Sequence, residues 1–322
     1  MRERPLMSNA RLTVVQSSYR PQIGVALWKV ADRGLAGFET AATAGLDHVH
    51  VDLGGPNRGP DLTDVEVLAA FDATSRRFAL PITALAVNRL NDLGLTAPRG
   101  SEEALEARRS ISHAIRVADR LRVPRIIIPG FRRSLVRRPE DVARTAEVLR
   151  FALGPAQAAG ITLAYESGLD SERTLQILQA VGQPGICLQF DTGNPAIYGH
   201  SAASIWARLA DVASPDVHLK DALGVSVDGD VPLGDGVAEL ELTFIAFARQ
   251  PGPTSFTLEG DYREDSGSRI GRDLARLKIL IGRSMLAGGL GCPDGVGCVG
   301  GSGVSRAEGM SLLECIDRWG AV

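Results

Sequence analysis

Short apolar runs alternate with longer amphipathic segments along most of the chain. Eight of the runs have the β-branched or alternating pattern of strands. They are Ile23–Trp28, His48–Leu53, Ile82–Val87, Arg125–Ile128, Ile161–Glu166, Ile186–Asp191, Asp216–Lys220 and Ser255–Glu259. Helical patterns follow them at Leu35–Ala44, Asp61–Phe78, Ser101–Leu121, Pro139–Ala159, Ser171–Ala180, Ser201–Val212, Val237–Arg249 and Arg269–Met285.

This alternation predicts an α/β fold, a (β/α)8 TIM barrel with its helices outside. The repeats span Ile23–Met285, close to the roughly 250 residues of such barrels. A doubly wound open sheet usually has fewer units and a glycine-rich turn after its first strand, which is absent here. We therefore assign residues 1–288 to the barrel. Residues 289–322 form a Gly-rich C-terminal extension, a linker and tail that either adds a helix at Ser305–Trp319 or lacks fixed order.

Composition narrows the class of partner. The net charge of -3 gives no electrostatic reason for nucleic acid or an anionic membrane to be the main partner. The chain has no apolar run long enough to span a bilayer and no apolar signal core near its start, so we expect a cytoplasmic location. A homo-oligomer is compatible with the sequence. Cys187 is expected to pack in its strand, whereas Cys292 and Cys298 either pair, bind metal or stay reduced.

Four consecutive strands end in a residue that can bind a metal. These residues are Glu166, Asp191, His218 and Glu259, and each shares a strand face with an earlier polar residue. All four side chains are therefore expected at the C-terminal mouth of the barrel. Three carboxylates meeting there would repel one another and resist desolvation, and a divalent cation would remove both costs. Three oxygens and one imidazole suit Mn²⁺ best, with Co²⁺, Mg²⁺ or Zn²⁺ as alternatives.

Each residue has a less specific interpretation when taken alone. A carboxylate at a strand end is usually a helix cap or a surface charge, and a lone histidine is usually a satisfied core residue. The same offset on four successive strands favours a shared site over four separate structural roles.

These residues also carry a family resemblance. Their contexts are AYESG, FDTGN, HLKDA with a following PLGDG, and LEGDY. The order resembles the xylose isomerase-like TIM barrel superfamily, and more narrowly its sugar phosphate isomerases and epimerases. The resemblance implies that Glu166, Asp191, His218 and Glu259 bind the metal, and that Glu166 and Glu259 also act as catalytic acid and base. Many relatives have a histidine where this chain has Asn194, which can bind a substrate hydroxyl but cannot relay a proton.

The expected activity is a metal-dependent isomerisation or epimerisation of a small sugar or sugar phosphate, by proton abstraction next to a carbonyl through an enediolate. A dehydratase or lyase acting on a keto-cyclitol or keto sugar needs the same proton abstraction. A phosphodiesterase or nuclease is disfavoured, because the multi-zinc endonucleases of the superfamily need more histidines than the five present. A non-catalytic metabolite binder is disfavoured by the presence of both glutamates.

Two basic residues have two interpretations each. Lys220 shares the face of His218, where it either steadies a developing negative charge or pairs with Asp216 or Asp221. Arg132 lies in the basic loop after the fourth strand. It either binds a phosphate or carboxylate of the substrate or pairs with neighbouring carboxylates.

The remaining candidates for substrate binding each have a structural alternative. His50 either lines the pocket or packs in the core. Trp28, at the end of the first strand, either stacks on a sugar ring or plugs the barrel. Gly234 and Gly236 in the PLGDG segment are expected to shape a loop rather than contact substrate.

Overall fold

The computed structural model describes residues 20–182, 184–249 and 252–288. Its strands are β1 Gln22–Ala26, β2 His48–Asp52, β3 Ile82–Ala86, β4 Arg125–Pro129, β5 Thr162–Glu166, β6 Ile186–Leu188, β7 Asp216–Leu219, β8 Asp221–Gly224, β9 Val227–Val231 and β10 Ser255–Leu258. Its α-helices are α1 Ala36–Thr43, α2 Val65–Phe78, α3 Leu90–Leu93, α4 Glu102–Leu121, α5 Pro139–Ala158, α6 Ser171–Val181, α7 Gly193–Ile197, α8 Ala202–Leu209, α9 Leu240–Arg249 and α10 Ser266–Gly288. The helix predicted at Ser305–Trp319 lies outside the described residues.

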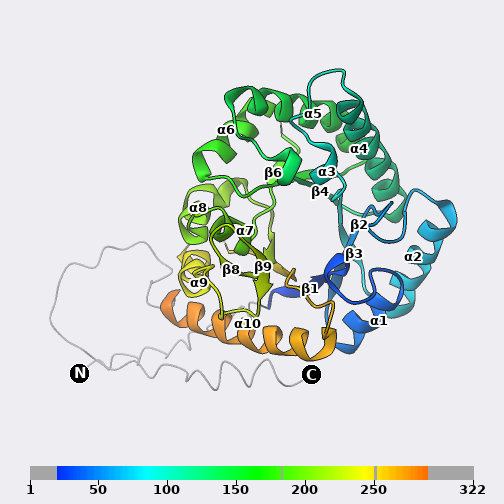
Figure 1. Cartoon of the computed structure of the whole chain (residues 1–322). Helices are drawn as coiled ribbons and strands as arrows, with labels where there is room; N and C mark the ends of the chain where they lie inside the picture. Colours follow the sequence, from blue (N-terminus) through cyan, green and yellow to red (C-terminus); the bar gives the residue numbers. More distant parts are fainter. Residues whose placement is uncertain (1–19, 183, 250–251, 289–322) are drawn as a thin grey trace, which may run out of the picture.

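Eight parallel strands curl into a closed barrel with the helices around it (Figure 1). The strand order is β6-β5-β4-β3-β2-β1-β10-β7. The parallel bridges Leu188↔Ala213 and Asp191↔His218 join the first of these strands to the last. The His218 amide also donates to the Phe190 carbonyl at 2.9 Å. The predicted (β/α)8 barrel is confirmed, and closure places β5, β6, β7 and β10 side by side.

The eight predicted helices are present with ends shifted by up to four residues, whereas the short helices α3 and α7 were not predicted. The Asp64 side chain caps α2, and Ser101 caps α4 by accepting from the Ala104 amide. The longer helices bury apolar residues against the outer face of the barrel. No α-helix of the described part is both long and apolar enough to cross a bilayer.

Small side chains fill the inside of the barrel. Ala84, Ala86, Ile127 and Ala164 form a separate apolar cluster, against which Trp28 and Cys187 pack. Burial raises the pKa of the Cys187 thiol to about 11, so this cysteine packs as an unreactive group, as expected. Cys292 and Cys298 lie outside the described residues.

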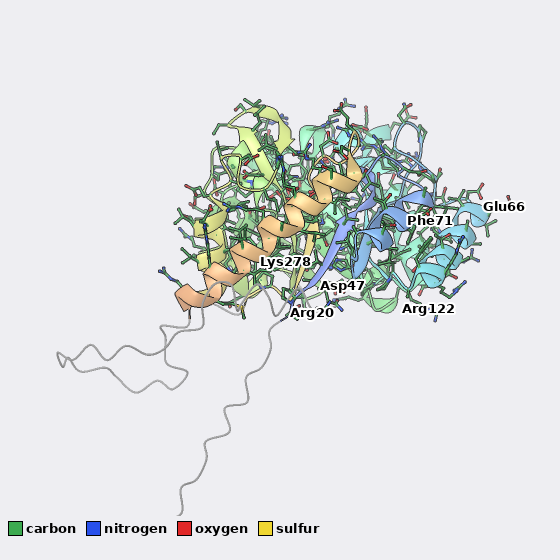
Figure 2. All side chains as sticks on the ribbon, turned by 90° about the horizontal axis from the view of Figure 1, so that it is seen from below. Arg20, Asp47, Glu66, Phe71, Arg122 and Lys278 are labelled. Carbon is green, nitrogen blue, oxygen red and sulfur yellow. The ribbon has the colours of Figure 1, made fainter. Side chains whose placement is uncertain are left out.

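The residues that precede and follow the strands identify the two ends of the barrel. Asp47 and Arg122 precede β2 and β4 and lie along the lower edge in Figure 2, at the N-terminal end of the strands. The residues that follow the strands lie at the opposite end. In TIM barrels that C-terminal end is where the catalytic loops lie.

The segment after β7 differs from the sequence-based prediction. It was expected to be a loop, but Asp221–Gly224 and Val227–Val231 pair as an antiparallel hairpin. The hairpin depends on Asp221, whose buried carboxylate accepts from the amides of Ala222, Gly234, Gly236 and Ala238 at 2.9–3.1 Å. A Cβ at Gly236 would lie 2.3 Å from the Ala222 carbonyl oxygen. These glycines therefore shape the loop, as expected.

Replacing Asp221 should destabilise the protein strongly. The Asp221→Ala variant leaves four amide donors without their acceptor, so the free energy of unfolding should fall by about 3 kcal/mol or more. Denaturant unfolding measures this value. Asp235→Ala, in the same loop but with a 63% exposed side chain, is the matched control and should cost less than about 0.5 kcal/mol. Equal losses in the two variants would contradict the anchoring role of Asp221.

Candidate active site

The barrel brings together the four residues predicted to bind a metal. Glu166 ends β5, His218 lies in β7, and Asp191 and Glu259 come just after β6 and β10. One potential ligand atom from each residue lies within 4.8 Å of all the others, and all four residues are buried. Since β5, β6, β7 and β10 are adjacent, the four groups form a continuous arc with the two glutamates at its ends.

Hydrogen bonds hold the two glutamates in place. His218 Nδ1 lies 3.2 Å from Glu166 Oε1 and 3.4 Å from Glu259 Oε2. The Asn194 side-chain amide donates to Glu166 Oε1 at 3.1 Å. The Trp28 indole N–H donates to Glu259 Oε1 at 3.0 Å. Asn194 and Trp28 therefore both orient a carboxylate.

Lys220 belongs to the same cluster. Its ammonium group donates to Glu259 Oε2 at 3.0 Å and lies 3.5 Å from Asp191 Oδ2. The alternative pairing with Asp216 or Asp221 is wrong. Asp216 begins β7, one strand length below Lys220, while Asp221 turns away to bind the loop amides.

Burial and like charge determine the protonation of these groups. Burial raises the pKa of Asp191 to about 7, with Glu259 and Glu166 adding to this and Lys220 opposing it. Burial alone would lower the pKa of His218, but Glu259 and Glu166 hold it well above its ordinary value. Burial would also raise the pKa of Glu259, but Lys220 and His218 hold it well below. Without another cation, a proton on His218 and the Lys220 ammonium offset two of the three carboxylate charges.

The donor set fits a divalent cation. Three carboxylates and one imidazole are ligands that Mn²⁺, Co²⁺, Mg²⁺ and Zn²⁺ accept to different degrees. Asp191 Oδ2 is buried and has no hydrogen-bond partner among the described residues. An oxygen that has lost its water without gaining a donor is costly, and a bound cation would satisfy it.

A second polar layer lies beneath the four residues. His50 Nδ1 lies 3.1 Å from His218 Nε2, and His50 Nε2 lies 3.7 Å from Asp216 Oδ2. Burial lowers the pKa of His50 to about 3, despite the opposing effect of Asp216, so His50 is neutral. With its own Nε2–H directed at Asp216, His50 accepts from His218 Nε2 and leaves His218 Nδ1 facing the carboxylates.

The prediction that His50 lines the pocket is therefore corrected. His50 is fully buried under His218, because β2 directs it into the barrel one layer below the mouth. Its contacts make it a residue that positions His218, in the way that outer partners orient metal-binding histidines.

The lower layer consists of polar residues that surround the Asp216 carboxylate. His48 Nε2 lies 3.4 Å from Asp216 Oδ2. Ser255 and Thr257 donate to Asp216 at 2.7 and 3.1 Å, and the Arg125 guanidinium lies 3.7 Å from it. Burial would raise the pKa of Asp216, but His50, His48 and Arg125 hold it well below its ordinary value. Because Arg125 already supplies the positive charge, this group functions as support for the cluster above it.

A pocket of about 640 Å³ opens over the cluster. The predicted residues that line it are Trp28, Arg132, Glu166, Asn194, Lys220 and Glu259. Sequence reasoning missed the polar lining residues Lys29, Arg33, Asp52, Asn57, Arg58, Asn91, Asp92, Tyr198 and Arg263. One usable signal was the glycine- and proline-rich GGPNRGP stretch directly after β2, at the end of the barrel where function is expected.

Removing the charge of Asp216 should destabilise the metal-free protein in a pH-dependent way. The folded-state pKa lies below the unfolded value of about 3.9, so the stabilisation is present above that pH and is lost as the pH falls towards the folded pKa. Asp216→Asn should therefore lower the free energy of unfolding by about 3 kcal/mol at pH 7 and by about 1 kcal/mol less at pH 3, since pH 3 is about one unit below the unfolded pKa. Chemical denaturation at both pH values measures this. The control is Ser255→Ala, which removes one hydrogen bond to Asp216 and no charge. Its loss in free energy of unfolding should depend little on pH. An equal loss for Asp216→Asn at both pH values would contradict the proposed role of the Asp216 charge.

Comparison with known proteins agrees with this architecture. Residues 38–280 match the family model described as xylose isomerase-like TIM barrel. A 2-epi-5-epi-valiolone 7-phosphate 2-epimerase of Actinoplanes sp. (strain ATCC 31044 / CBS 674.73 / SE50/110) is 35% identical over 255 residues, which cover 79% of this chain and 92% of that protein.

Solved structures share the fold at low sequence identity. The structure of L-ribulose 3-epimerase has a TM-score of 0.69 at 16% identity, covering 84% of this chain and 98% of that one. The IOLI protein, solved with a binding zinc atom, also has a TM-score of 0.69, at 13% identity over 82% of this chain and 99% of that one. By its family-model match and its curated relative, the chain belongs to the xylose isomerase-like TIM barrel family.

Proposed function

We propose that the chain is a divalent-metal-dependent epimerase or isomerase of a sugar or sugar phosphate. The observation that carries the proposal is the convergence of Glu166, Asp191, His218 and Glu259 under one pocket. The curated relative, an epimerase that is 35% identical over most of both chains, supports the reaction class.

The four converging residues are the proposed ligands of the cation. When bound, Mn²⁺, or alternatively Co²⁺, Mg²⁺ or Zn²⁺, would polarise a substrate carbonyl and stabilise negative charge on its oxygen. Its two charges, together with Lys220, would balance the three ionised carboxylates once His218 has lost its proton. Because the charges then cancel, the buried carboxylates are more stable with the cation bound than without it.

The two glutamates are the proposed acid and base. They lie at opposite ends of the ligand arc and both line the pocket, so they approach a substrate from different sides. One glutamate removes the proton next to the carbonyl, and the other returns a proton to the opposite face in an epimerase or to the neighbouring carbon in an isomerase. Lys220 donates to Glu259 and is placed to stabilise negative charge on the substrate.

Asn194 and Trp28 complete the substrate-facing set. Asn194 holds Glu166 and retains one amide hydrogen with which to donate to a substrate hydroxyl. Trp28 holds Glu259 through its indole N–H, and its ring is proposed to stack on the sugar. The cytoplasmic location and a homo-oligomeric state stay predictions.

Replacing either glutamate should separate proton exchange from epimerisation. In a two-base reaction, Glu166→Gln and Glu259→Gln should each lower turnover by roughly 10²-fold to 10⁴-fold. Each variant should still exchange the substrate proton of one epimer with D₂O, and the two variants should act on opposite epimers. Proton NMR of the manganese-loaded enzyme with a panel of ketoses and keto-cyclitols measures both rates.

The control is Glu264→Gln, an exposed residue that follows the same strand as Glu259. It should leave both rates unchanged. Full activity of the two test variants would contradict the acid–base assignment, as would full turnover of EDTA-treated wild-type protein. A product that has lost water would identify a dehydratase instead.

Binding of Mn²⁺ should release protons and strengthen as pH rises. His218, with its raised pKa, and Asp191, with a pKa of about 7, must each lose a proton before they can act as ligands. At pH 7 we expect roughly one to two protons released per ion, with affinity increasing roughly tenfold per pH unit for each proton. Isothermal calorimetry in buffers of different ionisation enthalpy counts them. His200→Gln, a histidine outside the cluster, is the control, and pH-independent binding would contradict the proposed ligand set.

A further inference from the structure

The half of the pocket rim formed by the loops after β1 to β4 is positively charged. Strands β1 to β4 lie next to one another on one side of the barrel (Figure 1). These loops lie across the barrel mouth from the four proposed ligands. In this half the charged residues that line the pocket are Lys29, Arg33, Arg58 and Arg132 against Asp52 and Asp92. Lys29 is neutralised by Asp230 at 2.7 Å. We call Arg33, Arg58 and Arg132 the basic rim.

Two arginines of the basic rim share one carboxylate. Arg58 Nη2 hydrogen bonds to Asp92 Oδ2, and Arg132 Nη1 lies 4.0 Å from Asp92 Oδ1. The Asp92 side chain is 58% exposed, so the pairing is largely solvated and inexpensive to rearrange. One carboxylate cannot neutralise two guanidinium groups, and each keeps donors that it does not use here.

Arg33 is the uncompensated member of the basic rim. It is half-buried and has no ion-pair partner among the residues that the structure describes. It lies beside the loop that carries Arg58, since a Cβ built on Gly59 would lie 3.4 Å from Arg33 Cβ. Asp92 and Asp52 are the carboxylates of this half that stand against the three arginines, so the basic rim carries a surplus of one positive charge.

The glycines at positions 54, 55 and 59 restrict the loop that carries Arg58 to one conformation. Gly54 has φ +78°, and a Cβ there would lie 1.7 Å from the Pro60 carbonyl oxygen, so a side chain is excluded. Gly55 and Gly59 form an antiparallel bridge, and the Arg58 amide donates to the Gly55 carbonyl at 3.0 Å. This geometry presents Arg58, whose side chain is only 21% exposed, at a fixed place on the pocket wall. A preorganised guanidinium loses less entropy when it binds an anion.

We infer that the basic rim is a subsite for the phosphomonoester end of the substrate. The inference rests on the proposed function, because that function places the reacting carbon at the opposite side of the pocket, between Glu166 and Glu259. Guanidinium groups bind phosphate through paired donors, and three guanidinium groups match the three terminal oxygens of a phosphomonoester better than the two oxygens of a carboxylate. The substrate class is therefore a phosphorylated sugar or sugar-like polyol that spans the pocket from the arginines to the two glutamates.

Binding of inorganic phosphate to the full-length, metal-free protein tests this subsite. Calorimetry or ³¹P NMR at constant ionic strength compares wild type with four variants, and acetate is titrated in parallel. Arg33→Met and Arg58→Met should each weaken phosphate binding by about tenfold. Asp92→Asn should tighten it several-fold, because it frees two guanidinium groups, and a misfolded variant would not show tighter binding. Arg76→Met removes the same charge from the outer face of the barrel on α2 and should change nothing.

Several results would overturn the subsite. They are no phosphate binding by wild type, unchanged binding in both arginine variants, weaker binding in Asp92→Asn, or acetate binding as tight as phosphate. Titration of the same variants with Mn²⁺ alone separates this inference from the proposed function. Phosphate binding without Mn²⁺ binding would refute only the metal site, whereas Mn²⁺ binding without phosphate binding would refute only the subsite.

Discussion

The structure depends on the burial of like charges at one point of the barrel mouth. Glu166, Asp191 and Glu259 are nearly inaccessible to water, and each would favour its neutral form if it were alone there. His218 and Lys220 lie among them and supply positive charge within 3.5 Å. The carboxylates of the site therefore outnumber its positive charges. The proton on the His218 imidazole supplies charge that a bound cation could supply instead. A cluster of this kind is expensive for a purely structural protein to maintain.

The fold provides the means to hold this arrangement. Parallel strands with a two-residue side-chain period direct every second residue into the barrel, so closure of β6 against β7 brings distant parts of the chain to one rim. Small residues such as Ala84 and Ala164 fill the inside of the barrel. Asp216 and His50 form a polar layer that fixes the ring of His218 from below. The four proposed ligands thus lie in or directly after strands, and the loops above them can vary with the substrate.

The sequence contained the fold and the ligand cluster because both follow from local periodicity. The offset of Glu166, Asp191, His218 and Glu259 on their strands is readable without coordinates. The partners of Lys220 were not readable, because its carbon chain reaches across to neighbouring strands instead of along its own. The position of His50 depends on depth in the barrel, which periodicity does not give. The segment after β7 depends on hydrogen bonds between residues 13 to 17 positions apart, such as those of Asp221. The shape of the GGPNRGP loop depends on the close approach of Gly54 to Pro60, which alternation of polar and apolar residues does not encode.

The pocket joins two electrostatic poles of opposite sign. At one pole lie the carboxylates of the ligand arc, and at the other lies the basic rim that surrounds Asp92. A substrate that bridges them would be oriented end to end before any chemistry occurs, which is a large part of what an active site contributes to rate. Conserving the first pole and varying the second would allow one barrel to act on different substrates.

The most direct test is the anomalous difference map of a crystal grown with Mn²⁺ and measured at the manganese absorption edge. The account predicts one strong peak bounded by Glu166, Asp191, His218 and Glu259, with the lower layer of His48, His50 and Asp216 free of metal. No peak among the four residues, or a peak only at the lower layer, would contradict it.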